Sequence, residues 1–279
     1  MVAMDIPHIL SQNINSGRVV LFLGSGATIG ATTVSGKEAP KGNDLANILS
    51  KEYFGDEKTT KALSSVAELA ISETDIHTVQ QYIKDYFDEF EPADFHLKIP
   101  TFRWVAIYTT NYDLVIERAY QKQLNKTQNI KCIYKNSDRV DEILRATDSI
   151  CYVKLHGCIT KTDDLTIPLI LTPDQYVTHK RNRDRLFNRL DEHGHQYTIV
   201  FVGYSLDDSD LRQALLSLSD SLDERPRFYT VTPSLSEAEV RMWEKKKITA
   251  LKGTFEDFIN SLDLTAPVAL RNVSRVKKQ

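Results

Sequence analysis

The sequence lacks several features that would place it in a familiar class at once. It has only three cysteines in 279 residues, Cys132, Cys151 and Cys158, and no C-x-x-C pair. A disulfide framework and a four-cysteine zinc site are therefore both excluded, and the thiols are expected in or near the core. No apolar run reaches about 18 residues and the start has no signal-peptide pattern. The sequence thus predicts a cytoplasmic protein with no membrane partner.

An excess of charge of one sign is also missing. Thirty-five Lys and Arg residues balance 38 Asp and Glu residues, and the net charge is −3. The basic clusters at 245–247 and 271–278 have the composition of solvated surface. Without a basic face, nucleic acid is not expected as a direct partner.

Short apolar runs alternate with helix-like stretches along the chain. This alternation predicts an α/β fold, with a Rossmann-like parallel sheet flanked by helices. The expected strands are residues 19–23, 104–108, 151–155, 198–202 and 228–232. The expected helices are residues 43–53, 59–71, 75–90, 112–124, 174–192 and 207–222.

The interval 43–100 contains helical patterns and no clear strand, which predicts a helical insertion beside the sheet. We expect a single domain over residues 1–279, either a whole protein or the effector domain of a longer chain. The aromatic residues Tyr82, Tyr86, Phe87 and Phe90 of the insertion could form a core or a contact with another subunit.

Small and polar residues follow each expected strand. The segments are GSGATIG, TTNYD, HG, GYSLDD and TPS, in that order. In open parallel sheets, ligands bind in the crevice beyond the carboxyl ends of the strands. The five segments are therefore expected to meet at one ligand site.

The glycine segment GSGATIG fits either a tight turn or a loop with free N–H groups that approaches a pyrophosphate. Its spacing departs from the dehydrogenase fingerprint, because the third glycine is Gly30. No strand ending in an acidic residue follows about 20 residues later, where such a domain would hold a ribose. A hydride-transferring Rossmann domain is therefore disfavoured.

The other polar residues also allow two interpretations. Asn111 and Asp113 could face the crevice or cap the helix that follows, and Ser205 could contact a ligand or open a capping box. His156, at a strand end, suits proton transfer at neutral pH, although a lone histidine is commonly structural. His193 and His195 lack a third metal ligand and are expected in a loop.

Taken together and in this order, GSGAT, TTNYD, KLHG, VFVGYSLDD and VTPS resemble the sirtuin-like superfamily, specifically its bacterial NAD-hydrolysing anti-phage defence branch. The resemblance spans about residues 15–235 and implies NAD as substrate.

The resemblance also implies roles for individual residues. Asn111 would orient the nicotinamide ribose and the attacking water, Asp113 would hold the nicotinamide carboxamide, and His156 would act as a base. The NAD-contacting set would comprise Gly24, Ser25, Gly26, Ala27 and Thr28 at the pyrophosphate and adjacent ribose, Gly203 and Ser205 on the adenosine ribose and phosphate side, Thr232 near the adenosine, and also Thr110.

One departure from protein-deacylating sirtuins bears on the reaction. Those enzymes carry a four-cysteine zinc ribbon after the His-Gly element, whereas no cysteine follows Cys158 here. The departure favours simple hydrolysis of NAD without a metal over deacylation, with an NAD or ADP-ribose sensing module as a further alternative. Because an unrestrained NAD hydrolase would kill its own cell, we expect control by self-assembly into a homo-oligomer or by an activating defence partner.

Overall fold

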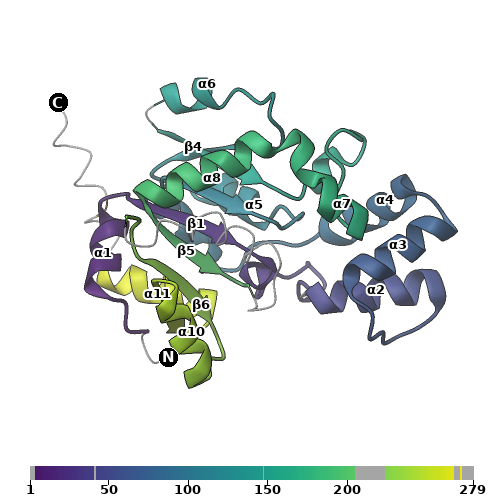
Figure 1. The fold of residues 1–279 in the computed structure, drawn as a ribbon, viewed down its shortest axis with the longest axis horizontal. Helices are drawn as coiled ribbons and strands as arrows, with labels where there is room; N and C mark the ends of the chain where they lie inside the picture. Colours follow the sequence, from purple (N-terminus) through teal and green to yellow (C-terminus); the bar gives the residue numbers. More distant parts are fainter. Residues whose placement is uncertain (1–3, 41, 147, 205–223, 267–270, 272–279) are drawn as a thin grey trace.

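A computed structural model describes residues 4–40, 42–146, 148–204, 224–266 and 271 of the chain. Its centre is a seven-stranded sheet in the order β3-β4-β2-β1-β5-β6-β7, and every pairing is parallel (Figure 1). The strands are β1 (Val19–Leu23), β2 (Ala106–Thr109), β3 (Asn129–Ile133), β4 (Ser149–Lys154), β5 (Thr198–Val202), β6 (Phe228–Thr232) and β7 (Ile248–Lys252). The predicted α/β fold with a parallel sheet is confirmed.

Alternating side chains of the central strand β1 supply two cores, because successive residues of a strand point to opposite faces. Val19, Leu21 and Leu23 belong to one apolar cluster, and Val20 and Phe22 belong to another. All five are buried, as expected for a strand covered on both faces.

Helices cover both faces of the sheet. The first cluster is completed by α1 (His8–Asn15), the 3₁₀ segment η2 (His96–Thr101), α5 (Val115–Lys122) and α11 (Phe255–Thr265). The second is completed by α6 (Val140–Arg145), α8 (Asp184–Gln196) and α10 (Glu237–Lys245). The result is a three-layer sandwich with the sheet in the middle.

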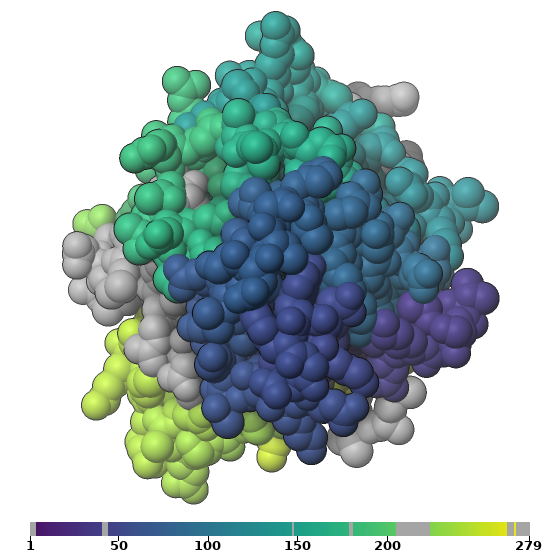
Figure 2. Space-filling view, turned by 90° about the vertical axis from the view of Figure 1, so that its right-hand side faces the viewer, coloured from purple at the N-terminus to yellow at the C-terminus, as the bar shows by residue number. Residues whose placement is uncertain are grey.

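The predicted helical insertion forms a lobe between β1 and β2. It consists of α2 (Gly42–Phe54), α3 (Leu63–Glu73) and α4 (Ile76–Phe87), which stand at one end of the sheet in Figure 1. Figure 2 looks onto this lobe, whose blue surface adjoins the green surface that includes α7 (Pro173–Thr178). The lobe has an apolar core of its own, which includes Phe87 and Phe90, while Tyr82 and Tyr86 pack partly buried against it.

The lobe core extends to residues that follow the strands. Tyr112 and Val115 come after β2, and Ile159 and Leu169 come after β4, yet all four pack with the lobe helices. A buried amide adds a polar link, since Gln80 Oε1 of α4 accepts a hydrogen bond from the Leu169 N–H at 2.7 Å. The lobe is therefore held against the carboxyl edge of the sheet.

The sequence patterns missed β3 and β7, the two edge strands. Only the last residue of β3 is fully buried, and β7 has two buried residues among five. An edge strand has one neighbour and shows more of its surface to water, so its sequence does not read as a continuous apolar run.

Two helix predictions need correction. The expected helix 112–124 begins only at Val115, because residues 111–114 form a turn. The expected helix 174–192 is divided into α7, the 3₁₀ segment η4 (His179–Asn182) and α8, with a break at Arg183, whose backbone φ of −135° is not helical. The expected helix 207–222 lies outside the described residues.

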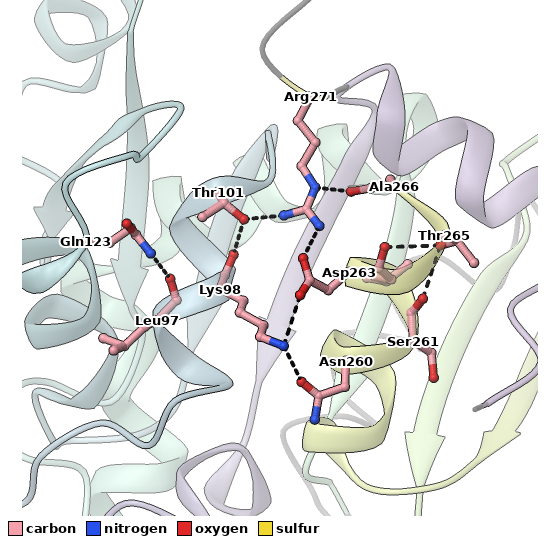
Figure 3. A network of polar contacts seen from close by, with 11 residues as sticks. Leu97, Lys98, Thr101, Gln123, Asn260, Ser261, Asp263, Thr265, Ala266 and Arg271 are labelled. Atoms are coloured by element: carbon pink, nitrogen blue, oxygen red, sulfur yellow. Dashed lines mark hydrogen bonds and ion pairs between the residues drawn. The ribbon is translucent and has the colours of Figure 1, made fainter. Parts of the chain in front are cut away.

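A polar network ties α11 to η2, as Figure 3 shows. Asp263 of α11 accepts hydrogen bonds or ion pairs from both Lys98 and Arg271, at 2.9 and 2.6 Å. The Arg271 guanidinium also donates to the Thr101 hydroxyl and lies 3.7 Å from the centre of the Phe102 ring. The network fixes η2 between the sheet and α11.

Within the described residues, no helix is both long enough and apolar enough to cross a bilayer.

Replacing Gln80 with Ala tests the polar link of the lobe. The change strands the buried Leu169 N–H, so the free energy of unfolding should fall by about 1–3 kcal/mol. Urea unfolding measures the loss. Gln81→Ala is the matched control, because Gln81 bonds only to Asp85 on the helix surface among the contacts described. Equal stability of the two variants would show that the Gln80 hydrogen bond does not help to hold the lobe against the sheet.

Candidate functional site

The predicted site residues gather where the strand order reverses. From β1 the chain moves to β2 on one side of the sheet, and after β4 it returns to β5 on the other side of β1. The loops after β1 and β5 thus leave the sheet side by side at the position where open α/β sheets bind ligands. The segments after β2 and β4 lie at the same edge.

The loop after β1 packs against the loop after β5 through glycines. A Cβ on Gly26 would lie 2.7 Å from the Gly203 Cα, and a Cβ on Gly203 would lie 2.4 Å from the Ala27 nitrogen. Gly203 also has φ +77°, a conformation that side chains oppose. A Cβ on Gly24 would meet the Tyr204 ring at 2.8 Å. Backbone packing therefore explains these glycines without any ligand.

The expectation of free N–H groups in the glycine loop is wrong for three residues. The N–H of Gly24 donates to the Val202 carbonyl, that of Gly26 to Gly203, and that of Ala27 to Gly24 itself. The first two bonds join the loop to residues 202 and 203, and the third belongs to the short 3₁₀ turn η1 (Ser25–Thr28), in which Ser25 is exposed and Thr28 is buried. The Thr28 hydroxyl donates to the Ser25 carbonyl at 2.9 Å.

Asn111 is brought directly onto the glycine loop. Its side-chain Nδ2 donates to the Gly24 carbonyl at 2.9 Å, and its backbone N–H donates to the Thr109 hydroxyl at 3.0 Å. A carbonyl can only accept, so the amide nitrogen faces Gly24 and Oδ1 is turned the other way. Asn111 as a whole is half-buried.

A second contact joins the segment after β2 to the loop after β5. The hydroxyls of Thr110 and Tyr204 are 2.9 Å apart, and the Tyr204 hydroxyl donates to the Leu23 carbonyl at 3.0 Å. Tyr204 is buried, and its ring centre lies 5.2 Å from that of Phe22. Tyr204 was not predicted as a site residue, although it lies inside the quoted segment GYSLDD.

Asp113 was interpreted as a possible N-cap, but the N-cap of α5 is Leu114, and Asp113 instead bonds to the first N–H of that helix. Its Oδ1 accepts from the Val115 N–H at 2.9 Å, and its side chain is buried with 4% of the residue exposed. Burial raises the pKa of the Asp113 carboxyl, and the nearby Lys154 ammonium opposes that rise. A contact of Asp113 with a ligand stays a prediction.

His156 follows β4 and is buried, with 2% of the residue exposed. Its carbonyl accepts from the Ile170 N–H at 3.0 Å, and its ring meets the Tyr176 ring edge-on at 5.3 Å between centres. The segment it belongs to touches the Asn111 turn, because the Ile159 N–H donates to the Tyr112 carbonyl. His156 is thus at the predicted edge, one strand further out than Asn111.

The adenosine-side residues are placed less completely. Gly203 is part of the loop contact, whereas Ser205 lies outside the described residues. Thr232 ends β6, two strands from β1, and its hydroxyl donates to the Ser234 carbonyl at 3.3 Å.

His96 is a residue beside the predicted site that the sequence did not reveal. It is fully buried at the start of η2, and its Nδ1 accepts from the Ala93 N–H at 3.1 Å. Its Nε2 must then carry the proton that it donates to the Ala27 carbonyl, 2.9 Å away. His96 therefore supports the glycine loop from beneath, and its partner lies too far along the chain to give a local signal.

Two further expectations concern thiols and histidines. Cys151 and Cys158 are buried and Cys132 is half-buried, which confirms that the thiols lie in or near the core. His193 and His195 are not in a loop, because α8 continues to Gln196. His193 Nδ1 lies 3.1 Å from the Tyr108 hydroxyl. Across the described residues, no three His, Cys, Asp or Glu side chains gather as metal ligands would.

Comparisons with known proteins agree on one family. A family model described as SIR2-like domain matches residues 105–251, more than half of the chain. The chain is 24% identical over 246 residues to Defense-associated sirtuin 2 of Bacillus subtilis, covering 85% of this chain and 23% of the relative. It is 26% identical over 221 residues to NAD(+) hydrolase ThsA of Enterococcus faecium, covering 78% and 43%. The chain thus spans less than half the length of either relative.

Solved structures share the fold. A Sir2 homologue–NAD complex aligns with a TM-score of 0.51 at 11% identity, covering 98% of this chain and 96% of that one. A mutant Sir2 homologue in complex with ADP-ribose aligns with a TM-score of 0.51 at 13% identity, covering 98% and 100%.

Acid should weaken the protein through His96. Burial lowers the His96 pKa from 6.5 to about 4, although its bond to Ala27 opposes the shift. Between those values the unfolded chain binds a proton that the folded protein does not. The stability is therefore complete above pH 6.5 and is lost as pH falls toward 4, by an amount on the order of 3 kcal/mol.

Urea unfolding at pH 7, 5.5 and 4.5 measures this dependence in the parent protein, in His96→Gln and in the surface control His8→Gln. The dependence of the free energy of unfolding on pH should be weaker in the His96 variant alone. Identical slopes in all three proteins would show that His96 is not a source of the acid sensitivity.

Proposed function

We propose that this chain, which belongs to the SIR2-like domain family, hydrolyses NAD at the bond between nicotinamide and ribose. The products are nicotinamide and ADP-ribose. The name of the Enterococcus faecium relative, NAD(+) hydrolase ThsA, supports this reaction, and so does the Sir2-type fold.

The observation that carries the proposal is the placement of Asn111. Its amide nitrogen donates to the Gly24 carbonyl, so Oδ1 is directed away from that bond, and the residue as a whole is half-buried at the carboxyl edge of the sheet. An amide oxygen fixed in this way can accept a hydrogen bond from a water or a ribose hydroxyl and so fix its position. Such positioning accelerates a reaction without any covalent role for the protein.

The chemistry requires little more than positioning and a base. Nicotinamide is bonded to ribose as a cationic pyridinium and leaves as a neutral molecule, so no acid is needed to protonate it. The ribose carbon develops positive charge as the bond lengthens, and water adds to that carbon. One proton must leave the water, and His156 is proposed to accept it. Asp113 is proposed to hold the nicotinamide carboxamide.

Binding of the rest of NAD supplies energy that can be used at the reacting bond. The η1 turn, through Ser25 and its neighbours in residues 24–28, is proposed to contact the pyrophosphate, with Thr110 beside it. Gly203, Ser205 and Thr232 are proposed to line the adenosine side. Residues 24–28 and Gly203 have structural reasons of their own, so their contact with NAD requires a separate test.

The biological setting is proposed from the relatives. The similarity to Defense-associated sirtuin 2 of Bacillus subtilis supports depletion of NAD as part of a bacterial anti-phage response. Residues 1–279 would act as one NAD-binding domain with a helical lobe, within a larger protein or complex. Self-assembly or a partner protein would then switch on the hydrolysis.

Replacing Asn111 with Ala should abolish nicotinamide release while leaving the affinity for NAD within about tenfold, because a positioning group acts mainly in the transition state. Release is followed by chromatography and binding by calorimetry. Asn125→Ala, on an exposed turn, is the control and should behave as the parent protein. Turnover above about a tenth of the parent rate would exclude Asn111 from the mechanism.

Replacing His156 with Ala should lower the rate of nicotinamide release by about 10² to 10⁴, the usual range for a general base. The same assay separates the alternatives for the parent protein. Release only with an acyl-lysine peptide would identify a deacylase, and binding without release would identify a sensor. An unaltered rate and pH profile in the variant would return His156 to a structural role.

A further inference from the structure

A buried ion pair lies beneath the Asn111 turn. Lys154, the last residue of β4, places its Nζ 2.8 Å from the Glu117 Oε1 of α5. The Lys154 side chain is fully buried and that of Glu117 is 11% exposed. The family comparisons and the predicted mechanism leave both residues without a role.

The ammonium also reaches the backbone of the turn itself. Lys154 Nζ donates to the Asp113 carbonyl and lies 3.5 Å from the Tyr112 carbonyl. Its protons are thus directed at the Glu117 carboxylate and at the carbonyls of residues 112 and 113. An ammonium can hold several acceptors at once in this way because it carries three donors.

The surroundings of Lys154 favour its charged form. Burial by itself would lower the Lys154 pKa, but Glu117, Cys158 and Asp113 together outweigh it and raise the pKa above its ordinary value. Burial raises the pKa of the Glu117 carboxyl, and Lys154 opposes that rise. One buried cation therefore serves two neighbouring carboxyl groups.

Stability alone is a poor explanation for this arrangement. A buried ion pair can commonly be replaced by apolar residues without loss of stability, because desolvation offsets the attraction. The ammonium also sits near the N-terminus of α5, where the helix dipole disfavours a cation. What the ammonium does achieve is to hold the carbonyls of residues 112 and 113 in one orientation.

We propose that Lys154 is a positioning residue, which fixes the turn at residues 111–113 so that the Asn111 amide is presented to the substrate. The effect on turnover rests on the proposed NAD hydrolysis, whereas the effect on the turn does not. Glu117 keeps the ammonium charged and directed at the turn.

The central experiment compares Lys154→Met/Glu117→Met with the parent protein. Removing both charges together avoids a stranded ion, so urea unfolding should show stability close to that of the parent. With the turn released, kcat for nicotinamide release should fall about 10- to 100-fold while KM for NAD changes less than about threefold. Arg227→Met/Glu244→Met, which removes a half-exposed pair between the residue before β6 and α10, is the matched control.

A second measurement needs no turnover. The N–H groups of Asn111, Val115 and Ile159 are bonded to or within the turn, so their hydrogen exchange reports its opening. Exchange should be about tenfold faster or more in the apolar double variant and unchanged in the control. Glu117→Gln, which keeps the lysine contacts to the carbonyls, should protect these amides better than the double variant does.

The outcomes separate the two proposals. If the parent protein releases no nicotinamide but the exchange pattern is as expected, NAD hydrolysis is refuted and the positioning role of Lys154 stands. Unchanged exchange in the double variant overturns the positioning role, whatever the turnover. If the double variant does not fold, Lys154→Gln, which retains an N–H donor, is compared with Lys154→Met. Equal exchange in that pair would also overturn it.

Discussion

The close approach of Gly26 to Gly203 is the contact on which the arrangement of the site depends. β1 and β5 are adjacent parallel strands, so the loops that follow them leave the sheet at the same level. The two loops can touch only because neither carries a Cβ at the contact, and a hydrogen bond from the Gly26 N–H to the Gly203 carbonyl joins them. This contact directs the Gly24 carbonyl toward Asn111, which binds it through its amide.

Two buried ionisable residues support this edge of the sheet, and their surroundings decide their charge. His96 faces one carbonyl and the rings of Phe95 and Phe255, with no carboxylate among its described contacts, so it remains neutral. Lys154 faces a carboxylate and peptide carbonyls, so it remains charged. One supports the glycine loop and the other the Asn111 turn. A neutral histidine thus supports the glycine loop, whereas a charged lysine supports the Asn111 turn.

The sequence predicted the elements whose residues form a clear local pattern, such as a continuous apolar run. The interior strands were predicted from their apolar runs, and the described residues just after β1, β2, β4 and β5 contact one another at one edge. The edge strands β3 and β7 were missed because half-exposed strands lack such a run. His96 had no signal, since Ala27 lies 69 residues away. Lys154 did have a signal in the sequence, because a lysine inside the apolar run CYVKL requires a partner of opposite charge. Which acid provides it depends on how α5 packs, and sequence spacing does not show that.

The strand order also has a consequence for synthesis of the chain. β3 precedes β4 in the sequence but lies outside it, and in the described sheet it pairs with β4. Since a chain emerges from the ribosome N-terminus first, residues 129–133 appear before the strand that will bind them. In the described sheet β3 pairs only with β4, so it has no partner strand until β4 has been made. The sequence NIKCI, with an exposed Lys131, suits a segment that stays unpaired and solvated until β4 is made, because a charged side chain discourages pairing with other nascent chains.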